Sequence, residues 1–152
     1  MWPEEMRSNT QMHILLVEDD AVDAEALQRA FRQHNFAVPV TVVKNGREAL
    51  AFLREKRPTH GVAQRYLILL DLNMPQMNGI EFLTALRHDE QLKQHIVFVL
   101  TTSNRDEDKE AAYEQQIAGY LLKSSSTNEF EQLITLLKTY EQTIEFPPEP
   151  VL

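Results

Sequence analysis

Charged and hydroxyl side chains stand directly after four short apolar runs of the sequence. HILLV is followed by Glu18 and Asp19, and YLILL by Asp71. HIVFVL is followed by Thr101, and IAGYLL by Lys123. Carboxylates that meet in one place repel each other unless a cation joins them, and oxygen ligands favour a hard ion such as Mg²⁺ over zinc or copper. If the four runs end at one edge of a fold, these residues predict a magnesium site.

Asp71 is the candidate for a chemical role at this edge. Mg²⁺ usually keeps several waters and takes one or two carboxylates together with phosphate oxygens, which leaves a carboxylate free. That carboxylate can attack phosphorus to form an acyl phosphate, while the metal, Lys123 and Thr101 bond the transferred oxygens. Taken singly, each residue also has a simpler interpretation. Residues 18–20 fit a solvated turn with a helix cap, and Asp71 fits a turn that ends a strand. Thr101 fits strand packing, and Lys123 fits a surface charge. Their occurrence together favours the chemical interpretation.

Five apolar runs predict β-strands: His13–Val17, Val38–Val43, Tyr66–Leu70, His95–Leu100 and Ile117–Leu122. Most are apolar without alternation, as expected of strands covered on both faces. Pro39 cannot donate a backbone hydrogen bond, so the second strand is predicted at a sheet edge. Strands that alternate with helices predict an open parallel sheet wound on both faces, with its chemistry at the carboxyl ends of the strands.

Amphipathic segments between these runs predict five helices. Asp20 is placed to cap the first, which ends near Asn35, and its expected apolar face consists of Val22, Ala26, Leu27, Ala30 and Phe31. The later helices are expected after the turns at Asn45-Gly46, Met74–Gly79, Thr101–Asp108 and Ser124–Thr127. Arg54–Arg65 is predicted to be a connecting loop because it contains Pro, Gly and several positive charges.

Composition predicts one domain and excludes several kinds of site. The chain has 152 residues, 15 Lys and Arg against 23 Asp and Glu, a net charge of −8, four Gly and no Cys. Without cysteine there is no thiolate metal site or thiol nucleophile, and four scattered glycines spell no nucleotide-binding loop. The acidic balance argues against nucleic acid, and no apolar run is long enough for a membrane span. We expect a cytoplasmic protein with a domain at 12–145 between tails at 1–11 and 146–152.

Four motifs resemble the response-regulator receiver domain of two-component signalling: VEDD at 17–20, LLDLNMPQMNG at 69–79, VLTTS at 99–103 and GYLLKS at 119–124. The resemblance extends from His13 to Ile144, and each motif falls on a predicted strand end. It implies a single-domain α/β protein with the flavodoxin-like receiver fold, a five-stranded parallel doubly wound sheet.

The resemblance also implies roles for individual residues. Glu18 and Asp19 match the metal-holding acidic pair, Asp71 the phosphoryl acceptor, and Asn73 a metal ligand through its backbone carbonyl. Thr101 matches the switch hydroxyl, Lys123 the lysine that pairs with the phosphoryl group, and Tyr120 the aromatic switch residue. Gly79 corresponds to the glycine of the loop after the acceptor. The implied cofactor is Mg²⁺.

Two features depart from the common receiver pattern. Ser124 follows Lys123 where most receivers have proline, and the 54–65 connection is longer than in minimal receivers. Together with the FPP tail, these features resemble the stand-alone receivers that partner bacterial phytochromes. With the chain ending at Leu152, no DNA-binding domain is expected, so output is expected by contact with a downstream protein or by phosphorelay.

The predicted function is a response regulator that accepts a phosphoryl group onto Asp71 from a histidine kinase, such as a bacterial phytochrome. It is a switch that catalyses its own phosphorylation and dephosphorylation, and not a metabolic enzyme. One alternative is a Mg²⁺-dependent phosphatase with an aspartyl nucleophile, although such enzymes of the haloacid-dehalogenase type need a second Asp where this chain has Asn73. Another alternative is a scaffold receiver that acts without phosphorylation. The polar residues retained at the strand ends count against it.

The final helix carries a broad apolar stripe: Phe130, Leu133, Ile134, Leu137, Tyr140 and Ile144, with Leu136 to one side. This stripe is wider than packing on one sheet face requires, so part of it is expected to be exposed. We therefore expect a homodimer through the final helix and the fifth strand, a face that receivers commonly use for pairing. In the alternative, Leu136 and the Phe146-Pro147-Pro148 tail cover the stripe within one chain.

Overall fold

The protein is described by a computed structural model that covers residues 12–56, 65–123 and 128–146. Its strands are β1 (Met12–Val17), β2 (Val40–Val43), β3 (Arg65–Leu70), β4 (Ile96–Thr101) and β5 (Gly119–Leu122). Its helices are α2 (Ala21–Gln33), α3 (Gly46–Glu55), α4 (Gly79–His88), α5 (Asp106–Glu114) and α6 (Asn128–Thr143). All strand pairs are parallel, in the order β2-β1-β3-β4-β5. The predicted parallel α/β sheet is confirmed.

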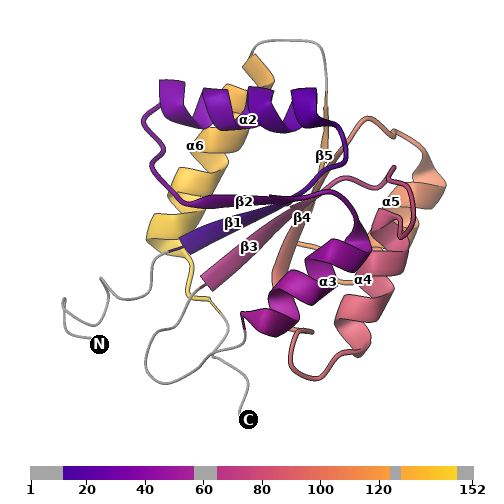
Figure 1. The fold of residues 1–152 in the computed structure, drawn as a ribbon. Coiled ribbons are helices and arrows are strands. Elements are labelled where there is room, and N and C mark those ends of the chain that lie inside the picture. The colour runs from indigo at the N-terminus through magenta and orange to yellow at the C-terminus, as the bar shows by residue number, and fades with distance from the viewer. Residues whose placement is uncertain (1–11, 57–64, 124–127, 147–152) are drawn as a thin grey trace.

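Two helical layers cover the sheet, with α2 and α6 on one face and α3, α4 and α5 on the other (Figure 1). Neighbouring strand residues therefore alternate between two separate cores. In β1, Ile14 and Leu16 belong to the cluster under α2 and α6, whereas Leu15 and Val17 belong to the other. All four side chains are buried. This explains why residues 14–17 of the strand are all apolar, since neither face meets water there.

The first helix follows its predicted cap, but its predicted apolar face is only partly confirmed: Leu27, Ala30 and Phe31 are buried, whereas Val22 is not. The Asp20 carboxylate accepts hydrogen bonds from the backbone N–H groups of Val22 and Asp23, as an N-cap residue does. Val22 was predicted to be buried, yet its exposed fraction is 77 %. It lies in the first turn of α2, on the solvent side. The buried stripe consists instead of Ala24, Leu27, Ala30 and Phe31.

The strand and helix boundaries differ from the predicted ones by a few residues. β2 lies at the sheet edge, as predicted, but it begins after Pro39, whose carbonyl accepts the Ile14 N–H at 2.9 Å. The helix α3 extends to Glu55, so the connection to β3 is shorter than the predicted loop.

The predicted helix opening at 124–127, Ser124, the two prolines of the tail and residues 1–11 lie outside the described residues. No helix in the described ranges is long and apolar enough to cross a bilayer.

Candidate functional site

The register of the two central strands brings Glu18 and Asp71 together. Val17 is paired with Leu70, so the next residue of each strand emerges at the same edge of the sheet. The Asp71 N–H donates to the Val17 carbonyl at 3.0 Å, which extends the pairing by one step. The strand order reverses between β1 and β3, the place where ligands bind in open α/β sheets.

The next two strands bring Thr101 and Lys123 to the same edge. Thr101 is the last residue of β4, and its side chain is fully buried. The Lys123 N–H donates to the Thr101 carbonyl at 2.8 Å and so continues the pairing of β4 with β5. Every side chain that the sequence placed at a strand end is therefore at the carboxyl edge of the sheet.

Glu18, Asp19 and Asp71 form an acidic cluster. One carboxylate oxygen from each lies within 4.8 Å of the others, and Glu18 and Asp71 are buried while Asp19 is exposed. The pKa of the Glu18 carboxyl is raised to about 7, mainly by burial and also by the Asp71 charge, although the hydrogen bond from Lys123 opposes both effects. Carboxylates gathered this closely fit a hard divalent cation, which would neutralise their repulsion. These residues therefore fit Mg²⁺.

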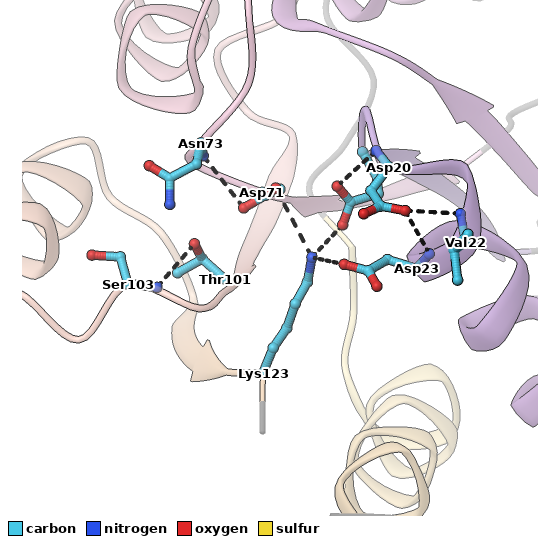
Figure 2. A network of polar contacts seen from close by, with 9 residues as sticks. Asp20, Val22, Asp23, Asp71, Asn73, Thr101, Ser103 and Lys123 are labelled. Atoms are coloured by element: carbon cyan, nitrogen blue, oxygen red, sulfur yellow. Dashed lines mark hydrogen bonds and ion pairs between the residues drawn. The ribbon is translucent and has the colours of Figure 1, made fainter. Parts of the chain in front are cut away.

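Lys123 reaches across the site and contacts three carboxylates (Figure 2). Its ammonium donates to Glu18 and lies 3.3 Å from an Asp23 oxygen and 3.9 Å from an Asp71 oxygen. Burial by itself would lower the pKa of Lys123, but the bond to Glu18 and the other two carboxylates raise it overall. Asp23 was not among the predicted site residues. Its position in the first turn of a capped helix is visible in the sequence, but the direction of its side chain is not.

The loop after Asp71 approaches the strand end very closely. A Cβ atom on Gly79 would lie 2.7 Å from the Asp71 carbonyl oxygen and 2.7 Å from the Leu72 Cα, so this position requires glycine. The Asn73 N–H donates to the Asp71 carboxylate at 3.3 Å. Asn78 then begins α4 in a capping box with Glu81. The loop is thereby fixed at both ends around the Asp71 carboxylate.

Tyr120 lies beside the loop that follows β4. Its hydroxyl donates to the Ser103 carbonyl at 2.8 Å, and burial raises the pKa of this phenol. The Ser103 N–H in turn donates to the Thr101 hydroxyl oxygen at 3.4 Å (Figure 2). The Ser103 hydroxyl donates to Asp108 of α5. Thr101 and Tyr120 are therefore connected through one residue, which the sequence analysis did not single out.

The family model for the response regulator receiver domain matches residues 14–135. The chain belongs to the response regulator receiver family. The match covers every element from β1 to the middle of α6, and all residues of the acidic edge lie inside it. The predicted resemblance to this family is confirmed.

Similar proteins include other response regulators, one of them a cyanobacterial phytochrome response regulator. Response regulator Rcp1 of Synechocystis sp. is 31 % identical over 141 residues, which cover 92 % of this receiver and 96 % of Rcp1. The phosphorylated cyanobacterial phytochrome response regulator RcpA superposes with a TM-score of 0.76 at 30 % identity, covering 91 % of this chain and 99 % of RcpA. The Mn²⁺-bound form of Rcp1 gives a TM-score of 0.74 at 30 % identity, with the same coverage.

Proposed function

We propose that Asp71 accepts a phosphoryl group from the phosphohistidine of a histidine kinase, in the presence of Mg²⁺. The observation that supports this most strongly is the environment of one carboxylate. Asp71 lies beside the buried Glu18 in the acidic cluster and 3.9 Å from the Lys123 ammonium. A nucleophile, a cation site and a positive group for the transferred oxygens thus occur at one edge of the sheet.

The transfer needs no further reactant. An Asp71 carboxylate oxygen attacks phosphorus, the phosphorus–nitrogen bond breaks, and the imidazole leaves with the electron pair. Mg²⁺ would be held by Glu18, Asp19, Asp71 and the Asn73 carbonyl, and when bound it supplies positive charge to the phosphoryl oxygens. Lys123 pairs with the same oxygens. The buried Thr101 hydroxyl donates to them as well.

The product is an acyl phosphate that water can hydrolyse, so the protein acts as a self-limiting switch and not as a metabolic enzyme. A phosphatase of the aspartyl type needs an acid two residues after the nucleophile, and the Asn73 amide has no acidic proton to give. A scaffold without phosphorylation leaves the ion pair between the buried Glu18 and the partly buried Lys123 unexplained, because burial of charged groups is costly. Both alternatives are therefore weaker.

The names of the relatives suggest the partners. RcpA is a cyanobacterial phytochrome response regulator, so we propose a phytochrome histidine kinase as the donor for this receiver. Output would follow by contact with a downstream protein or by phosphorelay. A homodimer through α6 and β5 is part of the proposal, since apolar side chains remain exposed on both elements.

Acetyl phosphate with Mg²⁺ tests the chemistry directly. We expect one acid-labile phosphoryl group per chain, detected by intact mass, and none in Asp71→Asn, whose amide is not a nucleophile. A Glu18→Gln, Asp19→Asn double variant should lose both labelling and its Mg²⁺ dependence. Equal labelling of Asp71→Asn would place the acceptor elsewhere. Purified histidine kinases compared for transfer rate would then identify the donor.

A further inference from the structure

Asp23 is a carboxylate at the acidic edge that none of the proposed steps uses. It lies in the first turn of α2, where the Asp20 side chain accepts its backbone N–H at 3.2 Å. Its own carboxylate points to Lys123, with 3.3 Å between Oδ2 and Nζ (Figure 2). The side chain is 48 % exposed, so it lies at the rim of the site and not within the buried cluster.

The position of Lys123 creates a conflict with metal binding. Its ammonium donates to Glu18, one of the carboxylates that would hold the cation. A metal ion and an ammonium on the same carboxylate repel each other, so metal binding requires Lys123 to withdraw from Glu18. Asp71 cannot accept it fully, because that carboxylate also faces the metal. Asp23 is the remaining carboxylate in contact with Lys123, and it lies on the side away from Asp71 (Figure 2).

We propose that Asp23 is a positioning residue that holds the Lys123 ammonium while Glu18 and Asp71 hold the metal. This inference rests on the proposed function. Asp23 thereby favours metal binding before the phosphoryl group arrives. Lys123 then moves from this rim carboxylate to the transferred oxygens, a short movement for a flexible side chain. Without Asp23, Lys123 stays on Glu18 and competes with the cation.

Metal affinity is the appropriate measurement, because it does not depend on the reaction. Mn²⁺ is added to the full chain and the electron paramagnetic resonance signal of the free ion is followed. We expect Asp23→Asn to weaken Mn²⁺ binding about threefold to tenfold, the range of a partly buried ion pair. Asp23→Glu should restore most of the affinity. Glu25→Gln, at an exposed carboxylate of α2 that pairs with Arg32, is the matched control and should leave affinity unchanged.

The same substitution in a second variant, Lys123→Met, distinguishes a positioning role of Asp23 from a general effect of lost negative charge. In Lys123→Met there is no ammonium to hold, so Asp23→Asn should change Mn²⁺ affinity less than twofold. An equal loss in both backgrounds, or no loss in either, overturns the inference. Failure of the unmodified protein to bind Mn²⁺ would instead overturn the proposed function. Thermal unfolding of each variant verifies that α2 stays folded.

Discussion

The Tyr120 hydroxyl donates to the Ser103 carbonyl at 2.8 Å, while the Ser103 N–H donates to the Thr101 hydroxyl oxygen at 3.4 Å. One residue of the β4–α5 loop therefore connects the end of β4 to the aromatic side chain of β5. We propose that phosphorylation draws the Thr101 hydroxyl toward Asp71, which weakens the Ser103–Thr101 hydrogen bond and frees the loop. The hydrogen bond of Tyr120 and the space open to its ring would then change together, as in a two-state element.

Thr101→Ala should separate phosphorylation from switching. The variant keeps Asp71, Lys123 and the acidic cluster, so it should still take up the phosphoryl group. It lacks the hydroxyl that moves to bond the phosphoryl oxygens, so the environment of Tyr120 should not change on phosphorylation. Fluorotyrosine NMR of Tyr120 before and after phosphorylation measures this response. Tyr113→Phe, which removes another tyrosine signal, provides the assignment control. A full Tyr120 response in Thr101→Ala would contradict the coupling.

The fold was predictable because two local signals agree at each strand. Runs such as YLILL are apolar at every position, and in the structure Leu67 and Ile68 enter opposite cores. The polar residue after each run then marks the strand end. Val22 shows where such reasoning fails: an apolar residue in the first turn fits the helical spacing, but Val22 is exposed and the buried stripe begins two residues later, at Ala24.

The residues that prediction missed act across long stretches of sequence. Asp23 meets Lys123 one hundred positions away, and Ser103 meets Tyr120 seventeen positions away. Arg87 is similar, since its partners lie in two separate loops. Spacing along one element cannot reveal such contacts, because they depend on how the loops pack after the sheet has formed.

The pH dependence of metal binding follows from Glu18. Burial raises its pKa to about 7, so without metal it is largely protonated below that pH. A cation must displace this proton, so affinity should fall as pH falls, by roughly tenfold between pH 8 and pH 6. The free energy of unfolding of the metal-free protein changes in the opposite direction. The folded chain binds the proton more tightly than the unfolded chain, so it gains stability as pH falls from about 7 toward 4.5.

Mn²⁺ titrations at several pH values, paired with urea unfolding of the metal-free protein, examine both trends. Glu18→Gln should bind the cation weakly but show little change of affinity over the same range, because the titrating carboxyl is gone. Affinity of the unmodified protein that stays constant between pH 8 and pH 6 would mean that Glu18 is already ionised at the lower pH.

Arg87 should contribute strongly to stability. Its guanidinium donates to the carbonyl oxygens of Gln115 at 2.7 Å, Gln116 at 3.0 Å, Lys93 at 2.7 Å and His95 at 2.8 Å. Arg87→Ala leaves these carbonyls without their donor and should lower the free energy of unfolding by about 2–4 kcal/mol. Arg54→Ala, which removes an exposed ion pair with Asp89, should cost less than about 1 kcal/mol. Similar losses in urea unfolding of the two variants would refute this assignment.

Among the described residues, the apolar face of α6 is only partly covered. Leu133, Ile134 and Leu137 are buried, and the Phe146 ring packs on Tyr140 with 6.0 Å between centroids. The turn after α6 therefore covers one end of the stripe, as the single-chain alternative requires. In the part of the chain that the structure describes, Leu136 stays exposed.

Leu136→Glu should weaken a homodimer that uses this face. Leu136 remains 38 % exposed on α6 and Leu122 remains 41 % exposed on β5. Exposed apolar surface of this kind favours an interface, and a two-fold dimer is its commonest closed form. Sedimentation velocity over a range of concentrations should show a dimer that dissociates more readily in the variant. Val22→Glu places the same charge on an exposed apolar position of α2 and should leave association unchanged. A monomer at every concentration, or a dimer that tolerates Leu136→Glu, would reject this interface, because a buried carboxylate without a partner cannot be accommodated there.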